Sequence, residues 1–143
     1  MEIAGDTEIS GNGHPIMIGH YLKSVIDATP GAVDGDGDPA MALAVPTEQF
    51  RTSYTFLVPA EYARNFVSIT NAAGGAVMLD GADVSGQFAS FASGAFAAAR
   101  VLVTAGQHSI TCAAGCGIEV YGYDDAVSYL FAGGLDLKQI VVD

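Results

Sequence analysis

Three aspartates alternate with glycines in the stretch Asp-Gly-Asp-Gly-Asp, which begins at Asp34 and runs into Pro39. Calcium is a hard cation that needs several oxygen ligands on a flexible backbone, and this stretch resembles the first half of a calcium-binding loop. The second half of the EF-hand pattern is missing, because Val45 stands where that pattern has Glu. We therefore expect Asp34, Asp36 and Asp38 to bind Ca²⁺ only with help from distant carboxylates, and otherwise to form a solvated turn. The distant candidates are Asp80, Asp83, Asp124 and Asp125.

The two cysteines, Cys112 and Cys116, are separated by Ala-Ala-Gly. This spacing suits the tip of a β-hairpin, where facing Cα atoms come within disulfide range. Two ligands are too few for a closed structural zinc site, and the C-x-x-C redox spacing is absent. The spacing predicts a disulfide that fixes the shape of the hairpin, with two reduced thiols as the alternative. Closure of so small a loop is expected to add little stability.

Three tyrosines near the end of the chain, Tyr121, Tyr123 and Tyr129, are candidates for a binding surface. Tyrosines on an outward strand face suit protein or glycan recognition, because each combines a large apolar ring with a polar hydroxyl. The alternative is that these side chains cover a second sheet or a loop.

No stretch of the sequence forms a recognisable catalytic motif. The serines lack a G-x-S-x-G elbow, and His14 and His20 are too far apart to bind one metal ion along a strand. His108 follows a glycine turn, where its ring can hydrogen-bond the backbone. We expect structural roles for these histidines and predict that the protein is not an enzyme.

The composition is strongly acidic, with 16 Asp and Glu against 5 Lys and Arg and a formal net charge of −11. Binding to a phosphate backbone needs a basic patch, so nucleic acid is not expected as a partner. No run of 18 apolar residues is present, so membrane insertion is not expected either. The first residues lack the features of a signal peptide. The predicted disulfide nevertheless favours an extracellular or cell-surface protein, whose chain here is a mature or excised piece.

Short alternating segments separated by Gly-rich turns predict an all-β fold of about nine short strands, arranged as an antiparallel, jelly-roll-like β-sandwich. The high glycine content, 18 of 143 residues, favours such a turn-rich fold over a helical bundle. Residues 1–14 are expected to be a loose or edge segment, and residues 15–143 a single domain. The expected strands are 15–22, 41–45, 53–58, 66–70, 76–79, 96–104, 108–112, 117–123 and 129–131.

Four parts of the chain, read together, resemble the N-terminal domain family of IgGFc-binding protein. The first is Pro15-Ile-Met-Ile-Gly-His-Tyr. The second comprises Gly37-Asp-Pro-Ala-Met, Val45-Pro-Thr-Glu-Gln-Phe and Ser53-Tyr-Thr-Phe. The third is Leu79-Asp-Gly, and the fourth comprises Gly106-Gln-His-Ser-Ile, Val120-Tyr-Gly-Tyr, Ser128-Tyr and Gly133-Gly134. The chain departs from the family at Val127, where an acidic residue is common, and in its pair of cysteines.

The resemblance implies an extracellular β-sandwich that recognises or links other molecules, without implying that it binds antibody Fc. We therefore expect a non-catalytic binding or adhesion module with a protein or glycan partner at a cell surface or in a matrix. The alternative is a self-assembling structural subunit of a surface fibre or layer, which would make the protein a homo-oligomer.

Overall fold

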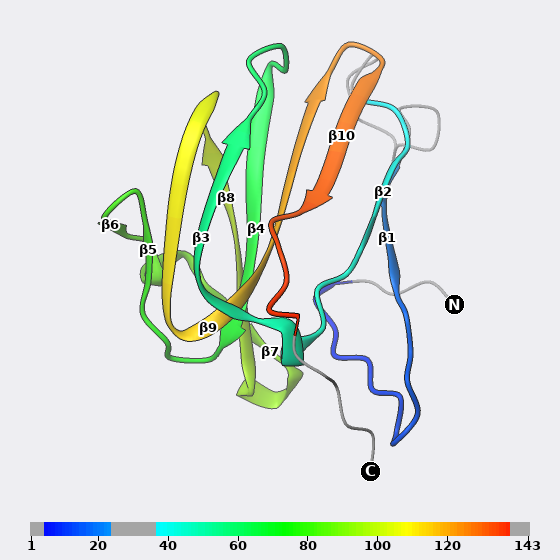
Figure 1. Cartoon of the computed structure of the whole chain (residues 1–143), viewed down its shortest axis with the longest axis vertical. Helices are drawn as coiled ribbons and strands as arrows, with labels where there is room; N and C mark the ends of the chain where they lie inside the picture. Colours follow the sequence, from blue (N-terminus) through cyan, green and yellow to red (C-terminus); the bar gives the residue numbers. More distant parts are fainter. Residues whose placement is uncertain (1–4, 24–36, 138–143) are drawn as a thin grey trace.

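The computed structural model describes residues 5–23 and 37–137, and over these ranges the chain forms ten β-strands and no α-helix (Figure 1). Within the same ranges, no helix has the length and apolar character needed to span a membrane. The strands are β1 Gly19–Leu22, β2 Ala40–Leu43, β3 Arg51–Val58, β4 Arg64–Ala72, β5 Val77–Leu79, β6 Ala82–Asp83, β7 Ala89–Phe91, β8 Phe96–Val103, β9 Gly106–Asp124 and β10 Val127–Ala132. Short 3₁₀ turns are η2 Thr47–Gln49, η3 Ser85–Gln87 and η4 Ala92–Gly94. The all-β class predicted from the sequence is confirmed.

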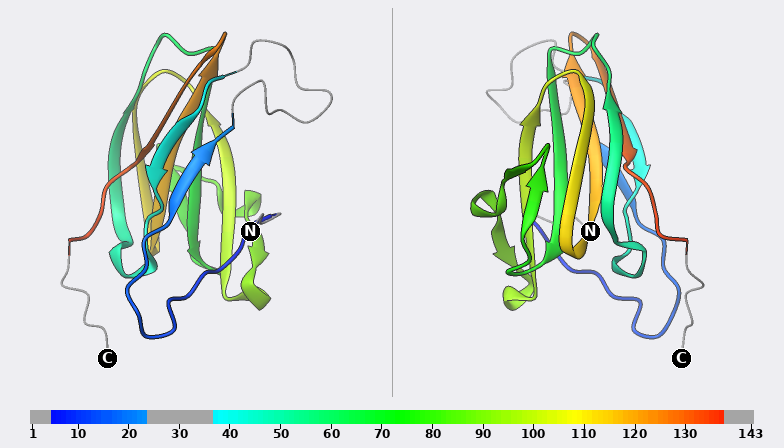
Figure 2. Two further views of the ribbon diagram at one scale, coloured as in Figure 1. Left: turned by 90° about the vertical axis from the view of Figure 1, so that its right-hand side faces the viewer. Right: turned by 60° about the vertical axis from the view of Figure 1, so that its left-hand side comes forward.

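Strand β9 organises the fold, because its 19 residues pair with four other strands. Its first half pairs with β3 and β5, and its second half pairs with β4 and β10. Strand β6 continues the sheet beyond β5, and β8 and then β7 continue it beyond β4. All of these pairings are antiparallel, and the resulting sheet curls on itself as a sandwich does (Figure 2). A strand that bends from one layer into the other is a known way to form the corner of a sandwich.

The core lies inside the curled sheet and follows the period of two that strands impose on their side chains. On β3, Tyr54, Phe56 and Val58 are buried while the residues between them are exposed. On β4, Val67 and Ile69 are fully buried. The other buried apolar residues of this cluster are Val77, Leu79, Val84, Ala99, Val101, Val103, Ile110, Cys112, Cys116, Ile118 and Val120. The alternation predicted for residues 53–58 and 66–70 is therefore the one that builds the core.

A small second sheet consists of β1 and β2, which pair antiparallel and lie beside β10 (Figure 1). The segment before β2 is attached to the β9–β10 hairpin by two backbone donors. The Gly37 N–H donates to the Asp124 carbonyl over 2.9 Å, and the Asp38 N–H donates to the Ser128 hydroxyl over 3.0 Å. Residues 5–14 contain no strand. The proposed division between residues 1–14 and a single domain from residue 15 stays a prediction.

The predicted hairpin at the cysteines is wrong, because residues 108–112 and 117–123 belong to one strand, β9. The chain contracts there without reversing: the Cys112 and Cys116 Cα atoms are 5.9 Å apart, whereas four residues of extended strand span about 13 Å. Opposite this bend, β3 advances by two residues, from Ser53 to Arg51, while β9 advances by five. The three extra residues form a bulge in which Gly115 has a φ of +82°. Partner strands on both sides keep β9 in the sheet.

Candidate binding surface

An aromatic row crosses the outward side of the sheet where β9, β4 and β8 lie next to one another. Tyr121 on β9 is opposite Phe66 on β4, which in turn is opposite Leu102 on β8. The rings of Phe66 and Tyr121 are stacked with centroids 5.3 Å apart, and Tyr123 lies edge-on to both. The guanidinium of Arg64 lies 5.9 Å from the centre of the Tyr123 ring, within the range of a cation–π contact. We call these five residues the outer face.

The outer face presents apolar surface together with neutral phenols. Phe66, Tyr121 and Tyr123 are half-buried, and Leu102 is 66 % exposed. Burial raises the pKa of both tyrosines above the ordinary value, so their hydroxyls remain protonated at physiological pH. Each hydroxyl can then donate and accept a hydrogen bond at the edge of an apolar surface. This combination is common where proteins bind other proteins.

Charged residues from the N-terminal segment border the outer face. Asp6 forms an ion pair with Arg100 on β8 over 2.5 Å, and His20 on β1 forms one with Glu119 on β9 over 2.6 Å. Arg100 and Glu119 are both opposite Ser68 of β4, so the two ion pairs lie in one row across the sheet. The hydrogen bond with Glu119 raises the pKa of His20, which favours its charged form. These contacts hold the N-terminal segment against the sheet.

The structure separates the three tyrosines that the sequence singled out. Tyr121 and Tyr123 are together on the outer face, whereas Tyr129 points to the other side of the sheet and packs against the core. The Tyr129 hydroxyl donates to the buried Asn65 amide oxygen over 2.8 Å. Its ring also stacks on Phe131. Burial raises the pKa of Tyr129 to about 12.

The predicted calcium ligands Asp34 and Asp36 lie outside the described residues. Asp38 is described, and its backbone N–H is hydrogen-bonded to Ser128 as part of the turn into β2. Of the distant candidates, Asp124 lies closest to this turn in the hydrogen-bond network, because its carbonyl accepts from Gly37. Among the described residues, no three His, Cys, Asp or Glu side chains are grouped so as to hold a metal ion. Calcium binding therefore stays a prediction.

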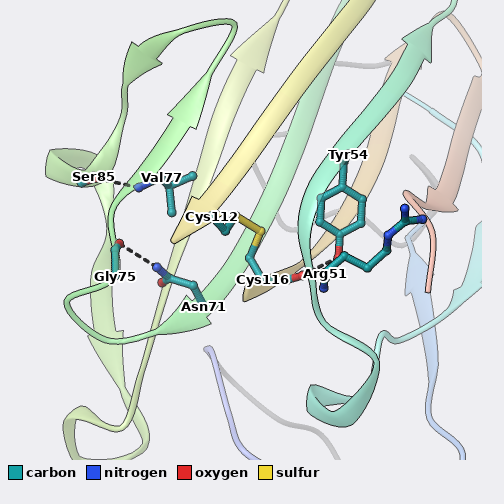
Figure 3. Close-up of a disulfide and its surroundings, with 8 residues drawn as sticks. All are labelled: Arg51, Tyr54, Asn71, Gly75, Val77, Ser85, Cys112 and Cys116. Atoms are coloured by element: carbon teal, nitrogen blue, oxygen red, sulfur yellow. Dashed lines mark hydrogen bonds between the residues drawn. A yellow bond between two sulfur atoms is a disulfide. The ribbon is translucent and has the colours of Figure 1, made fainter. Parts of the chain in front are cut away.

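The structure contains the predicted disulfide between Cys112 and Cys116, and both cysteines are buried in the core (Figure 3). Cys112 is opposite Val77 on β5, and Cys116 is opposite Asn71 on β4. The hydroxyl of Tyr54, on β3, donates to the Cys116 carbonyl. The disulfide therefore closes the bend at which β9 passes from one layer to the other.

An ion pair that the sequence did not reveal joins the buried His108 to the exposed Asp80. The His108 Nδ1 lies 2.6 Å from an Asp80 carboxylate oxygen, and its Nε2 lies 2.8 Å from the Thr104 carbonyl. Both partners are acceptors only, so both ring nitrogens must donate and the imidazole must be cationic. Burial lowers the pKa of His108, but the bonds to Asp80 and Thr104 outweigh it and the net shift is upward. The hydrogen bond from His108 lowers the pKa of Asp80.

The ion pair fixes the turn between β5 and β6 to β9. Asp80 and Gly81 have φ values of +51° and +81°, as a two-residue hairpin turn with positive φ at both positions requires. The Asp80 carboxylate also accepts from the Ser109 N–H over 2.7 Å. Asp80 belongs to Leu79-Asp-Gly and His108 belongs to Gly106-Gln-His-Ser-Ile, which are two parts of the family resemblance. The resemblance was therefore the one signal in the sequence that connected the two residues.

Comparison with known proteins identifies one family. The family model described as IgGFc binding protein matches residues 2–122. The match includes the outer-face residues up to Tyr121, both cysteines and the Asp80–His108 pair, and it ends within β9, before β10. No curated protein and no solved structure matches the chain.

Proposed function

Because the chain belongs to the IgGFc binding protein family, we propose that it is a non-catalytic extracellular module that binds a protein partner in adhesion at a cell surface or in a matrix. The observation that carries this proposal is the outer face. It combines half-buried aromatic rings, one strongly exposed leucine and an arginine stacked on a tyrosine. Tyr, Phe and Arg are enriched in the centres of protein interfaces, where they supply most of the binding energy.

Two further features support an extracellular binding role. The disulfide is buried in the core, and disulfides form and persist mainly in oxidising environments. The net charge of −11 opposes binding to the phosphates of nucleic acids. Asp80 and His108, which both have shifted pKa values, are engaged in a structural ion pair with each other.

Site-specific photo-cross-linking tests the proposal with a matched control. A benzophenone amino acid replaces Leu102 on the outer face in one protein, and Leu57 on the outward side of β3 in another. The two leucines are 66 % and 68 % exposed, so they are equally accessible to solvent. On intact cells or matrix, we expect defined protein adducts at position 102 that are absent at position 57. Identical adducts at both positions, or none at position 102, would contradict the proposal.

The alternative of a self-assembling surface subunit is supported by a different observation. On the side of the β1–β2 sheet that faces solvent, Tyr21, Met41 and Leu43 are 63 %, 55 % and 50 % exposed. Such a row of exposed apolar side chains is a candidate contact between copies of the chain. Size-exclusion chromatography of the wild type and of Met41→Asp separates the two proposals. A concentration-dependent oligomer that the substitution dissolves supports self-assembly, and a monomer at all concentrations rules it out.

A further inference from the structure

A pocket of about 270 Å³ lies where the chain passes from β4 through a turn into β5, away from the outer face. Its lining combines polar groups, an aromatic ring and two glycines: Asn71, Gly74, Gly75, Asp83, Ser85 and Phe88. The volume is just below the usual range of about 300 to 1,000 Å³ for ligand sites, which suits a ligand smaller than a drug molecule. The disulfide bend borders this region, since its cysteines are opposite Val77 and Asn71 (Figure 3).

Asn71 contributes an unused acceptor to this pocket. The side chain is 2 % exposed, and its Nδ2 donates to the Gly75 carbonyl over 2.9 Å. Its Oδ1 is buried and has no hydrogen-bond partner among the described residues. Buried polar atoms are nearly always paired, and an unpaired one costs about 1 to 3 kcal/mol. A ligand that donates a hydrogen bond to this oxygen would therefore remove a penalty that the protein alone carries.

Asp83 supplies a second acceptor and is held in place by Ser85. The Ser85 hydroxyl oxygen accepts from the Val77 N–H over 3.0 Å, and the hydroxyl hydrogen-bonds the Asp83 carboxylate. One Asp83 oxygen accepts from the Ser85 N–H over 2.9 Å. These hydrogen bonds from Ser85 lower the pKa of Asp83, so the exposed carboxylate is charged at neutral pH. The rim thus presents a fixed hydroxyl beside a fixed carboxylate.

Phe88 and the two glycines give the pocket its apolar and open walls. Phe88 is packed against the core cluster, which holds its ring in place. Gly74 has a φ of +82°, a conformation that favours glycine. A Cβ atom at Gly75 would come within 3.1 Å of Asn71 Nδ2, so a side chain there would press on the amide. Both glycines leave the wall beside Asn71 free of side chains.

We propose that this pocket binds a neutral, hydroxyl-rich ligand, namely a sugar residue of a glycan. Sugar hydroxyls can donate to the Asn71 and Asp83 acceptors. The C–H face of a sugar ring packs against an aromatic ring such as Phe88. An anionic ligand would meet the Asp83 carboxylate, and no Lys or Arg lines the pocket. Calcium needs more carboxylate ligands than the single one present here.

The glycan site is separate from the outer face, so the two proposals stand or fall independently. The outer-face substitutions test the protein partner, and pocket substitutions test the sugar. A module with both sites would contact a glycoprotein, or a glycoprotein-rich matrix, through two surfaces.

Saturation-transfer NMR with a set of methyl glycosides tests the glycan proposal directly. The set comprises the methyl glycosides of glucose, galactose, mannose, fucose and N-acetylglucosamine, each added to the wild type and to variants. We expect transfer to at least one glycoside, together with amide shift changes at Gly74, Gly75 and Ser85. In Asp83→Asn and Phe88→Leu the affinity should fall about tenfold or more, which corresponds to about 1.4 kcal/mol. Asp83 is exposed, so its variant keeps the fold, as an unchanged amide spectrum elsewhere would show.

Leu57→Asp on the outward side of β3 is the matched control and should bind the glycoside as the wild type does. Absence of transfer from every glycoside would overturn the proposal. Transfer that persists unchanged in Asp83→Asn and Phe88→Leu would also overturn it, because the sugar would then bind elsewhere.

Discussion

At the residue scale, the charge on His108 follows from what surrounds its ring. A neutral imidazole has one donor and one acceptor, yet both nitrogens face acceptors, the Asp80 carboxylate and the Thr104 carbonyl. The ring also stacks on Phe56 with a centroid separation of 5.6 Å. A neutral His108 ring therefore keeps only one of these two hydrogen bonds.

The first prediction concerns the pH dependence of stability. Folding raises the pKa of His108. Its contribution to the free energy of unfolding is therefore complete below the pKa of the unfolded state, about 6.5, and is lost as the pH rises through the pKa of the folded state. The pKa of Asp80 is lowered, so its contribution is complete above the unfolded value and is lost as the pH falls through the folded one. Urea unfolding measured across pH should show a decrease in the free energy of unfolding at each end of the pH range. His108→Gln should abolish the decrease at high pH and should lower the free energy of unfolding near pH 6 by about 1.5 to 3 kcal/mol.

His20→Gln is the control, because His20 also has a raised pKa but lies on the exposed β1 strand. It should change the free energy of unfolding far less than His108→Gln does, since exposed ion pairs contribute little. Equal losses of stability with equal pH dependence in the two variants would contradict a larger contribution from the His108–Asp80 pair.

The second prediction distinguishes the inward and outward tyrosines. Tyr129→Phe removes the hydroxyl that donates to Asn65 and leaves the buried Asn65 oxygen without that donor. We expect a loss of about 1 to 3 kcal/mol in the free energy of unfolding. Tyr121→Phe should change it by less than about 0.5 kcal/mol, as is usual for surface positions. Chemical denaturation of both variants measures the difference, and equal effects would contradict the assignment of Tyr129 to the core.

At the element scale, the bend in β9 determines how the two layers are joined. Cys112 and Cys116 lie where β9 exchanges β3 and β5 for β4 and β10 as neighbours. The Ala113 N–H also donates to the Ala76 carbonyl, so the bulge is attached to the turn before β5. The disulfide thus holds a corner of the sheet rather than the tip of a hairpin.

The third prediction concerns removal of this disulfide. Closing a loop of about five residues stabilises the folded state by about 2 kcal/mol in the chain-entropy treatment, which is little compared with the larger loops that disulfides close. Cys112→Ala together with Cys116→Ala should therefore lower the melting temperature by several degrees. Because the bend borders the pocket, amide shifts should change at Gly74, Gly75 and Ser85 and remain unchanged at Leu102. Reduction of the wild type is the parallel control. Equal changes in amide shift at the pocket residues and at Leu102 would contradict a local effect of the disulfide on the pocket.

At the scale of the whole molecule, the net charge of −11 favours binding of cations, and the Asp34–Asp38 stretch is the predicted calcium site. A ligand that binds only the native state must raise its melting temperature. The fourth prediction is a higher melting temperature in millimolar CaCl₂ than in EDTA, abolished by Asp34→Asn together with Asp36→Asn. Glu61→Gln, at an exposed glutamate outside the candidate ligands, is the control for non-specific charge screening. No shift with calcium would leave the stretch as a solvated turn.

Much of the fold could be predicted from local patterns. The alternation in residues 53–58 and 66–70 gave the correct buried faces of β3 and β4, because a strand places every second side chain on the same side. Residues 82–95 contain too few apolar side chains for such a pattern, and the structure has only the short strands β6 and β7 there. The spacing of the cysteines predicted their bond but not the path of the chain between them.

The sequence by itself determined the all-β class, the disulfide, the exclusion of a basic nucleic-acid surface and the family resemblance, since each depends on residue types or short-range spacing. Only the tertiary structure decided that β9 continues through the cysteines as one bent strand, that Tyr129 faces inward and that Asp80 pairs with His108. The reason is physical: Ala-Ala-Gly can reverse a chain or form a bulge, and the choice depends on partner strands that are distant in sequence. The same long-range pairing places an unused acceptor on Asn71 beside Ser85 and Asp83, where no local pattern would reveal a pocket.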